Sequence, residues 1–113
     1  MLLILLAALV AAAEVSASTL SVVELEFDLH YNDFNLNWAE NQVRSAVLST
    51  LKDEKSKYGS GATKISSRGV GDDDKVGITI QALDLNCDHI SEFAKAVMSK
   101  VHRTSRLASL TCY

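Results

Sequence analysis

Apolar and polar side chains alternate strictly over residues 22–31. The apolar positions are Val23, Leu25, Phe27, Leu29 and Tyr31. The polar positions are Glu24, Glu26, Asp28 and His30. A period of two residues is typical of a β-strand that packs one face on a core and leaves the other in water. The pattern therefore predicts a first strand whose outer face carries a row of carboxylates.

A helical pattern follows this strand. Residues 32–37 are typical of a turn, and Asn37 with Glu40 three positions later resembles a capping box. Apolar residues then recur at spacings of three and four, at Ala39, Val43, Ala46, Val47, Thr50 and Leu51. This stripe predicts a helix over residues 38–57, ended by the glycine-rich residues 59–61.

A β-hairpin is predicted next. Residues 62–68 have a weak strand pattern, and residues 75–85 have a stronger one. The second of these strands places Val76, Ile78, Ile80 and Ala82 on one face. Residues 69–74 contain two glycines and three aspartates, which favours a tight turn between the strands.

A second helix and a last strand complete the pattern. The helix starts near Asn86 or Asp88, and residues 104–112 are predicted to form the strand. The apolar stripe of the helix is Ile90, Phe93, Ala94, Val97 and Val101. The resulting order, β-α-β-β-α-β, predicts a ferredoxin-like α+β sandwich with two helices on one face of a four-stranded antiparallel sheet.

The N-terminus carries a different pattern, an unbroken apolar run over residues 2–13. At about 1.5 Å per residue, a helix of this run is too short for a bilayer core of roughly 30 Å. Small residues follow, and cleavage after Ala13 or between Ala17 and Ser18 is typical of a secretory signal peptide. We favour cleavage after Ala17, although no Lys or Arg precedes the apolar run.

Length and composition fit one small domain over residues 18–113 behind this signal. The chain of 113 residues is 48% hydrophobic and 22% charged, as in ordinary globular proteins. Its net charge of −3 argues against nucleic-acid binding. The third predicted strand also lacks the aromatic residues with which RNA-binding modules stack bases. We expect a secreted, extracellular or cell-surface location, with no stable membrane span after cleavage.

The two cysteines of the chain are Cys87 and Cys112. A pair of cysteines in a secreted chain favours one disulfide. In the predicted topology the third and fourth strands end on the same side of the sheet. Cys87 opens the second helix there and Cys112 closes the fourth strand, so we expect the two to be bonded.

No residue pattern indicates a catalytic set, a metal site or a cofactor. The histidines lie on different predicted elements, at positions His30, His89 and His102. None of their spacings is that of zinc ligands. Residues 72–74 are adjacent aspartates, whereas a calcium loop needs oxygens at alternating positions. We interpret these aspartates as a solvated turn.

Four of these elements carry a resemblance to a known family: residues 22–27, the helix from Trp38, the hairpin strand around residues 76–80, and the second helix. Together they resemble a SEA-type domain, a ferredoxin-like module of extracellular and cell-surface proteins, over about residues 20–112. Some members of that family cleave themselves at a Gly-Ser bond in the hairpin between the second and third strands.

In the corresponding hairpin of this chain, Gly69 and Gly71 are followed by Val70 and Asp72. The chain's Gly-Ser pair, at Gly59, precedes the second strand. The resemblance therefore does not extend to self-cleavage.

Three function classes follow from these patterns. The leading hypothesis is a secreted or surface-associated, non-enzymatic module that binds an unknown extracellular protein or glycan. The first alternative is a small protease inhibitor or prodomain-like chaperone, and the second is a small hydrolase or ligand carrier. The acidic row of Glu24, Glu26 and Asp28 could meet a basic partner or be a solvated face.

Overall fold

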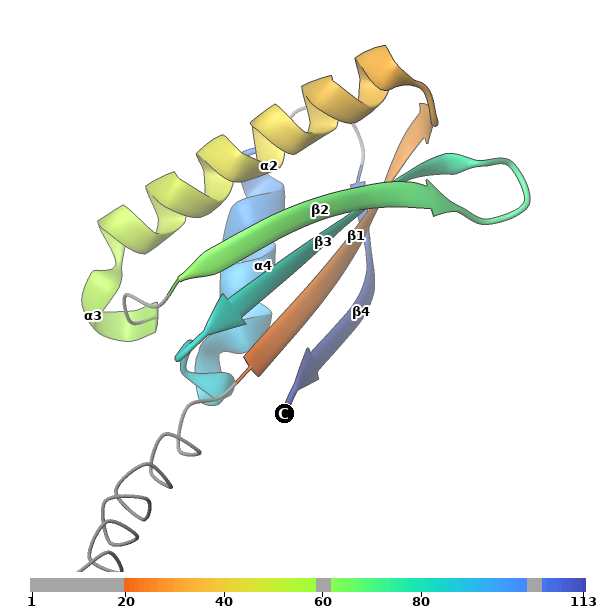
Figure 1. Cartoon of the computed structure of the whole chain (residues 1–113). Helices are drawn as coiled ribbons and strands as arrows, with labels where there is room; N and C mark the ends of the chain where they lie inside the picture. The colour runs from red at the N-terminus through yellow and green to blue at the C-terminus, as the bar shows by residue number, and fades with distance from the viewer. Residues whose placement is uncertain (1–19, 59–61, 102–104) are drawn as a thin grey trace, which may run out of the picture.

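The computed structural model describes residues 20–58, 62–101 and 105–113. Its elements are β1 (Leu20–His30), α2 (Asp33–Asp53), α3 (Lys55–Tyr58), β2 (Thr63–Val70), β3 (Lys75–Leu83), the 3₁₀ turn η1 (Cys87–His89), α4 (Ile90–Ser99) and β4 (Ser105–Cys112). The strands form one antiparallel sheet in the order β2-β3-β1-β4, and both long helices lie on the same side of it (Figure 1). This arrangement confirms the ferredoxin-like α+β class.

The predicted signal peptide, with its cleavage site between Ala17 and Ser18, lies outside the described residues, as do His102 and residues 59–61. Within the described segments, no helix combines the length and the apolar character that crossing a bilayer requires.

The central strand β1 alternates as its sequence predicts. Val23, Leu25 and Phe27 are buried, whereas Glu24, Glu26 and Asp28 point to the other side. β1 pairs with β3 on one flank and with β4 on the other. The strand begins two residues earlier than predicted and ends at His30, so Tyr31 falls beyond it and is exposed.

The first helix begins at Asp33, and the prediction that Asn37 caps it is wrong. Asn32 is the cap, because its side-chain oxygen accepts a hydrogen bond from the backbone N–H of Asn35 at 2.8 Å. The expected turn at residues 32–37 is the first turn of α2, where short polar side chains are well tolerated. Glu40, expected to complete the capping box, instead accepts a hydrogen bond from the Ser67 hydroxyl on β2.

The core lies between the sheet and the two helices. Its helical contributions include Val43 and Val47 from α2 and Phe93 and Val97 from α4. Tyr58 of α3 packs edge-on against Phe93, with ring centroids 5.4 Å apart. Burial raises the pKa of the Tyr58 hydroxyl.

The disulfide joins Cys87 at the start of η1 to Cys112 at the end of β4, with Cα atoms 6.0 Å apart. This pairing is the one expected from the sequence. β3 ends at Leu83, earlier than predicted, because Asp84 adopts a positive φ of 61° that an extended strand does not accommodate. Asn86 then caps η1 by accepting a bond from the Asp88 N–H at 3.0 Å, and regular α-helix starts at Ile90.

Candidate functional site

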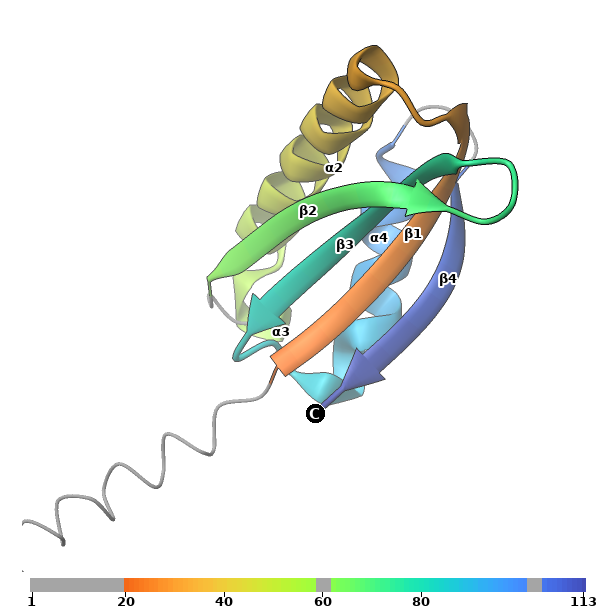
Figure 2. The same cartoon turned by 45° about the vertical axis from the view of Figure 1, so that its right-hand side comes forward.

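One face of the sheet carries no helix in the part of the chain that is described, and we call it the open face (Figure 2). It is formed by the outward side chains of all four strands. These include Lys64, Ser66 and Arg68 on β2, Lys75, Gly77 and Thr79 on β3, Glu24, Glu26 and Asp28 on β1, and Arg106 and Ser109 on β4.

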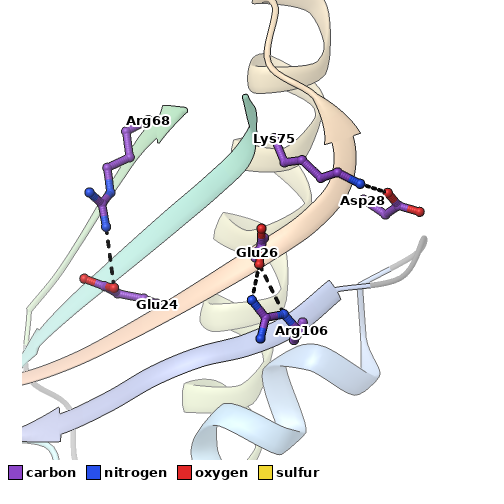
Figure 3. A network of polar contacts seen from close by, with 6 residues as sticks. All are labelled: Glu24, Glu26, Asp28, Arg68, Lys75 and Arg106. Atoms are coloured by element: carbon purple, nitrogen blue, oxygen red, sulfur yellow. Dashed lines mark hydrogen bonds and ion pairs between the residues drawn. The ribbon is translucent and has the colours of Figure 1, made fainter. Parts of the chain in front are cut away.

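Each carboxylate of β1 on the open face contacts a cation from a neighbouring part of the sheet (Figure 3). Glu24 lies 3.6 Å from the Arg68 guanidinium of β2. Glu26 accepts a hydrogen bond from Nε of Arg106 on β4 at 3.1 Å, together with a second bond from the same guanidinium.

The third pair joins Asp28 to Nζ of Lys75, on β3, at 2.5 Å. The hydrogen bond from this ammonium to Asp28 raises the pKa of Lys75. The row that the sequence analysis considered for a basic partner is therefore already matched by cations of the same chain.

The arginines lie further out than the carboxylates they contact. The side chain of Arg106 is 71% exposed, against 21% for Glu26. Ion pairs this exposed contribute only about 0–1 kcal/mol each to stability. The main effect of each arginine pair is to orient the guanidinium. The carboxylate holds the guanidinium in place, and its other N–H groups remain free to donate hydrogen bonds.

A depression of about 230 Å³ is lined by two of these pairs, Glu24–Arg68 and Glu26–Arg106. Strand register places Arg68, Gly77, Glu26 and Arg106 in one row across the four strands. Gly77 contributes no side chain to this row, and it lines the depression. A Cβ atom there would lie 2.6 Å from Cγ1 of Val70, so the Val70 side chain occupies the space that a larger residue at position 77 would need.

The remaining residues considered from sequence do not come together. His30 is exposed at the end of β1, and His89 contacts Glu92 at 3.0 Å near the start of α4. The aspartates at residues 72–74 lie in the exposed turn of the hairpin. No group of three or more His, Cys, Asp or Glu side chains suited to a metal ion occurs among the described residues.

Sequence reasoning found the carboxylates of the open face but missed the cations. The alternation of β3 could have placed one of the cations on the open face, because Lys75 falls on the side opposite the buried Val76 and Ile78. Arg68 and Arg106 gave none, because the pairing of their strands with the rest of the sheet is a tertiary feature.

No protein-family model and no curated protein matches this sequence. A solved structure with a similar fold is that of the ferredoxin protease FusC, in a mutant form, in complex with Arabidopsis ferredoxin. The match has a TM-score of 0.50 and 8% sequence identity, and it covers 72% of this chain and 10% of that chain. This chain thus spans about a tenth of the length of the chain it matches. At this identity the likeness is one of fold alone.

Proposed function

We propose that the chain is a secreted or surface-associated, non-enzymatic module that binds an extracellular protein through the open face of its sheet. The observation that carries the proposal is the arrangement of four charged side chains, ordered as two cross-strand pairs, around a depression that no described helix covers. The disulfide and the signal-like N-terminus support the location.

The charge pattern of the open face favours a protein partner. A central acidic column on β1 is flanked by Arg68 on one side and Arg106 on the other. Because the carboxylates are already paired and the arginines reach further into water, a complementary surface presents acidic side chains to Arg68 and Arg106. Such complementarity mainly sets specificity and association rate, and arginine is enriched in protein interfaces.

The test is a binding screen of the oxidised protein against a panel of purified extracellular proteins, read by biolayer interferometry at two salt concentrations. We expect saturable binding to at least one panel member, weakened by salt. The variant Arg68→Glu/Arg106→Glu should weaken this binding at least about tenfold, which corresponds to about 1.4 kcal/mol.

Two further variants sharpen the test. Glu26→Arg/Arg106→Glu keeps a pair on β1 and β4 but reverses its direction, so it should also abolish binding if the pattern matters. Arg44→Glu/Lys52→Glu makes the same charge change on the exposed side of α2 and should leave binding unchanged.

Equal losses in the open-face and α2 variants would contradict the proposal. Absence of any binding together with turnover of generic hydrolase substrates would also contradict it. Nanomolar inhibition of a protease would instead support the inhibitor or prodomain-like alternative.

A further inference from the structure

A second surface, distinct from the open face, lies where β1 passes into α2. It contains a cavity of about 250 Å³ lined by Leu29, Phe34, Asn35 and Trp38. Phe34 is 77% exposed, the largest exposed fraction among the large apolar side chains of the described chain. Phe34 is not isolated, because the partly buried Leu29 and Trp38 line the same cavity, and such a contiguous apolar surface points to a ligand.

The cavity is rigidly built from local structure. Phe34 and Trp38 are four residues apart on α2, and such residues are neighbours on a helix surface. Trp38 packs edge-on against the buried Phe27, with ring centroids 6.4 Å apart and planes at 88°. The indole is therefore held by the core, while the Phe34 ring beside it faces water.

Asn35 adds a polar group to this aromatic surface. Its backbone N–H donates to Asn32 Oδ1, and its Nδ2 donates to the backbone oxygen of His30, both at 2.8 Å. These bonds fix the turn between β1 and α2. They also commit one N–H of the Asn35 amide, whose Oδ1 can accept a hydrogen bond from a ligand.

We infer that this cavity binds a single neutral sugar ring of a glycan. Its volume is below the roughly 300–1,000 Å³ of pockets for drug-sized ligands, which favours a small ligand. A pyranose ring offers an apolar C–H face to stack on Phe34 and Trp38, and hydroxyl groups to reach the Asn35 amide. None of the lining residues is charged, and Asp33 adjoins them in sequence, which disfavours an anionic ligand.

The test uses Trp38, the single tryptophan of the chain, as a fluorescent reporter inside the site. The oxidised protein is titrated with methyl glycosides of glucose, galactose, mannose and N-acetylglucosamine. We expect a saturable change in emission with at least one of them, at a Kd of about 1 mM, as for one small ring with few polar contacts. Glucuronic acid should bind more weakly than glucose.

The variant Phe34→Ala should weaken this binding at least about tenfold. Because Phe34 is so exposed, the variant should keep the wild-type circular dichroism and Tm. Leu48→Ala removes another exposed apolar side chain, 59% exposed, from the same helix and should leave the titration unchanged. The variant Arg68→Glu/Arg106→Glu should also bind sugar normally, which separates this site from the proposed protein-binding face.

Amide chemical shifts give a second readout. Shifts confined to residues 29–38 on adding the glycoside would support the inference. The inference is wrong if no glycoside gives saturable fluorescence or amide shifts, or if Leu48→Ala weakens binding as much as Phe34→Ala. It is also wrong if the cavity is filled only by an aromatic side chain of a protein partner.

Discussion

The two faces of the sheet differ in what their side chains contribute, although the same strand supplies both. Phe27 and Glu26 are neighbours on β1, yet Phe27 is fully buried under the helices while Glu26 contacts Arg106 in water. The covered face stabilises the folded state by burying apolar surface, which contributes about 25 cal/mol per Å². The ion pairs of the open face contribute little to folding stability, but they give this face a defined charge pattern. The alternation of a single strand thus separates the side chains that stabilise the fold from those of the proposed binding face.

The largest expected effect tests this separation directly. Phe27→Ala should lower the free energy of unfolding by about 3–5 kcal/mol, because it leaves a cavity in the core. Glu26→Gln, one residue away on the opposite face, should lower it by about 0–1 kcal/mol. Urea unfolding followed by circular dichroism measures both. Similar losses in the two variants would contradict the assignment of roles to the faces.

The disulfide connects the covered layer to the edge strand β4. Cys87→Ser/Cys112→Ser should destabilise the protein by about 3 kcal/mol, since the bond closes a loop with a sequence separation of 25. Reductant should shift the urea midpoint of the wild type and leave that of the double variant unchanged. Two free thiols in the native protein, detected by mass spectrometry after alkylation, would refute the bond.

Thr50 is a buried polar residue on the helix stripe of α2. Its Oγ1 is buried and has no hydrogen-bond partner among the described residues, in a helix stripe that is otherwise apolar. Thr50→Val keeps the shape and removes this unsatisfied hydroxyl, so it should stabilise the protein by about 1 kcal/mol. Thr50→Ala should destabilise it by leaving a void. Thermal unfolding of both variants separates the effect of removing the hydroxyl from the effect of lost packing. If Thr50→Val destabilises the protein instead, the hydroxyl has a hydrogen-bond partner.

The smallest effect concerns an ion pair on the helical side. Glu92 contacts Lys57 at 3.0 Å and His89 at 3.0 Å, and the hydrogen bond from Lys57 holds its pKa below the ordinary value of 4.5. A lowered pKa means that the carboxylate stabilises the fold fully above pH 4.5 and loses this effect as the pH falls through the folded-state pKa.

Glu92→Gln should therefore lie slightly below the wild type in Tm at pH 6, with the difference vanishing toward pH 3. The lysine of the Asp28–Lys75 pair titrates at the other end of the pH scale, because its raised pKa keeps the contribution of the ammonium intact until the pH rises above 10.5. A Glu92→Gln difference that grows in acid would contradict the lowered pKa.

Much of the fold follows from local patterns, and the errors have local causes too. The alternation predicted for residues 22–31 was correct as far as His30, and the stripes of both helices were correct, because burial selects those periods directly. The start of α2 was misplaced because Asn32 and Asn37 are both acceptable caps in sequence. Asn35 bonds to Asn32 and His30 and so selects the earlier start.

The candidate site was predictable only in part. The carboxylates of β1 follow from alternation, and Phe34 and Trp38 lie one helical turn apart in any helix that includes both. Lys75, the partner of Asp28, is 47 residues away in sequence, and Arg106, the partner of Glu26, is 80 residues away. Which cation lies beside which carboxylate depends on strand register. Nor does the sequence show that Phe34 remains uncovered while Trp38 is held by Phe27.

The sequence by itself determined the order of strands and helices, the fold class and the cysteine pair, because each depends on periodicity or on the order of elements along the chain. The tertiary structure alone decided the cross-strand ion pairs and the depression at Gly77. These features require distant segments to lie within a few ångströms of each other. Such distances follow from register and packing, which no local pattern of residues encodes.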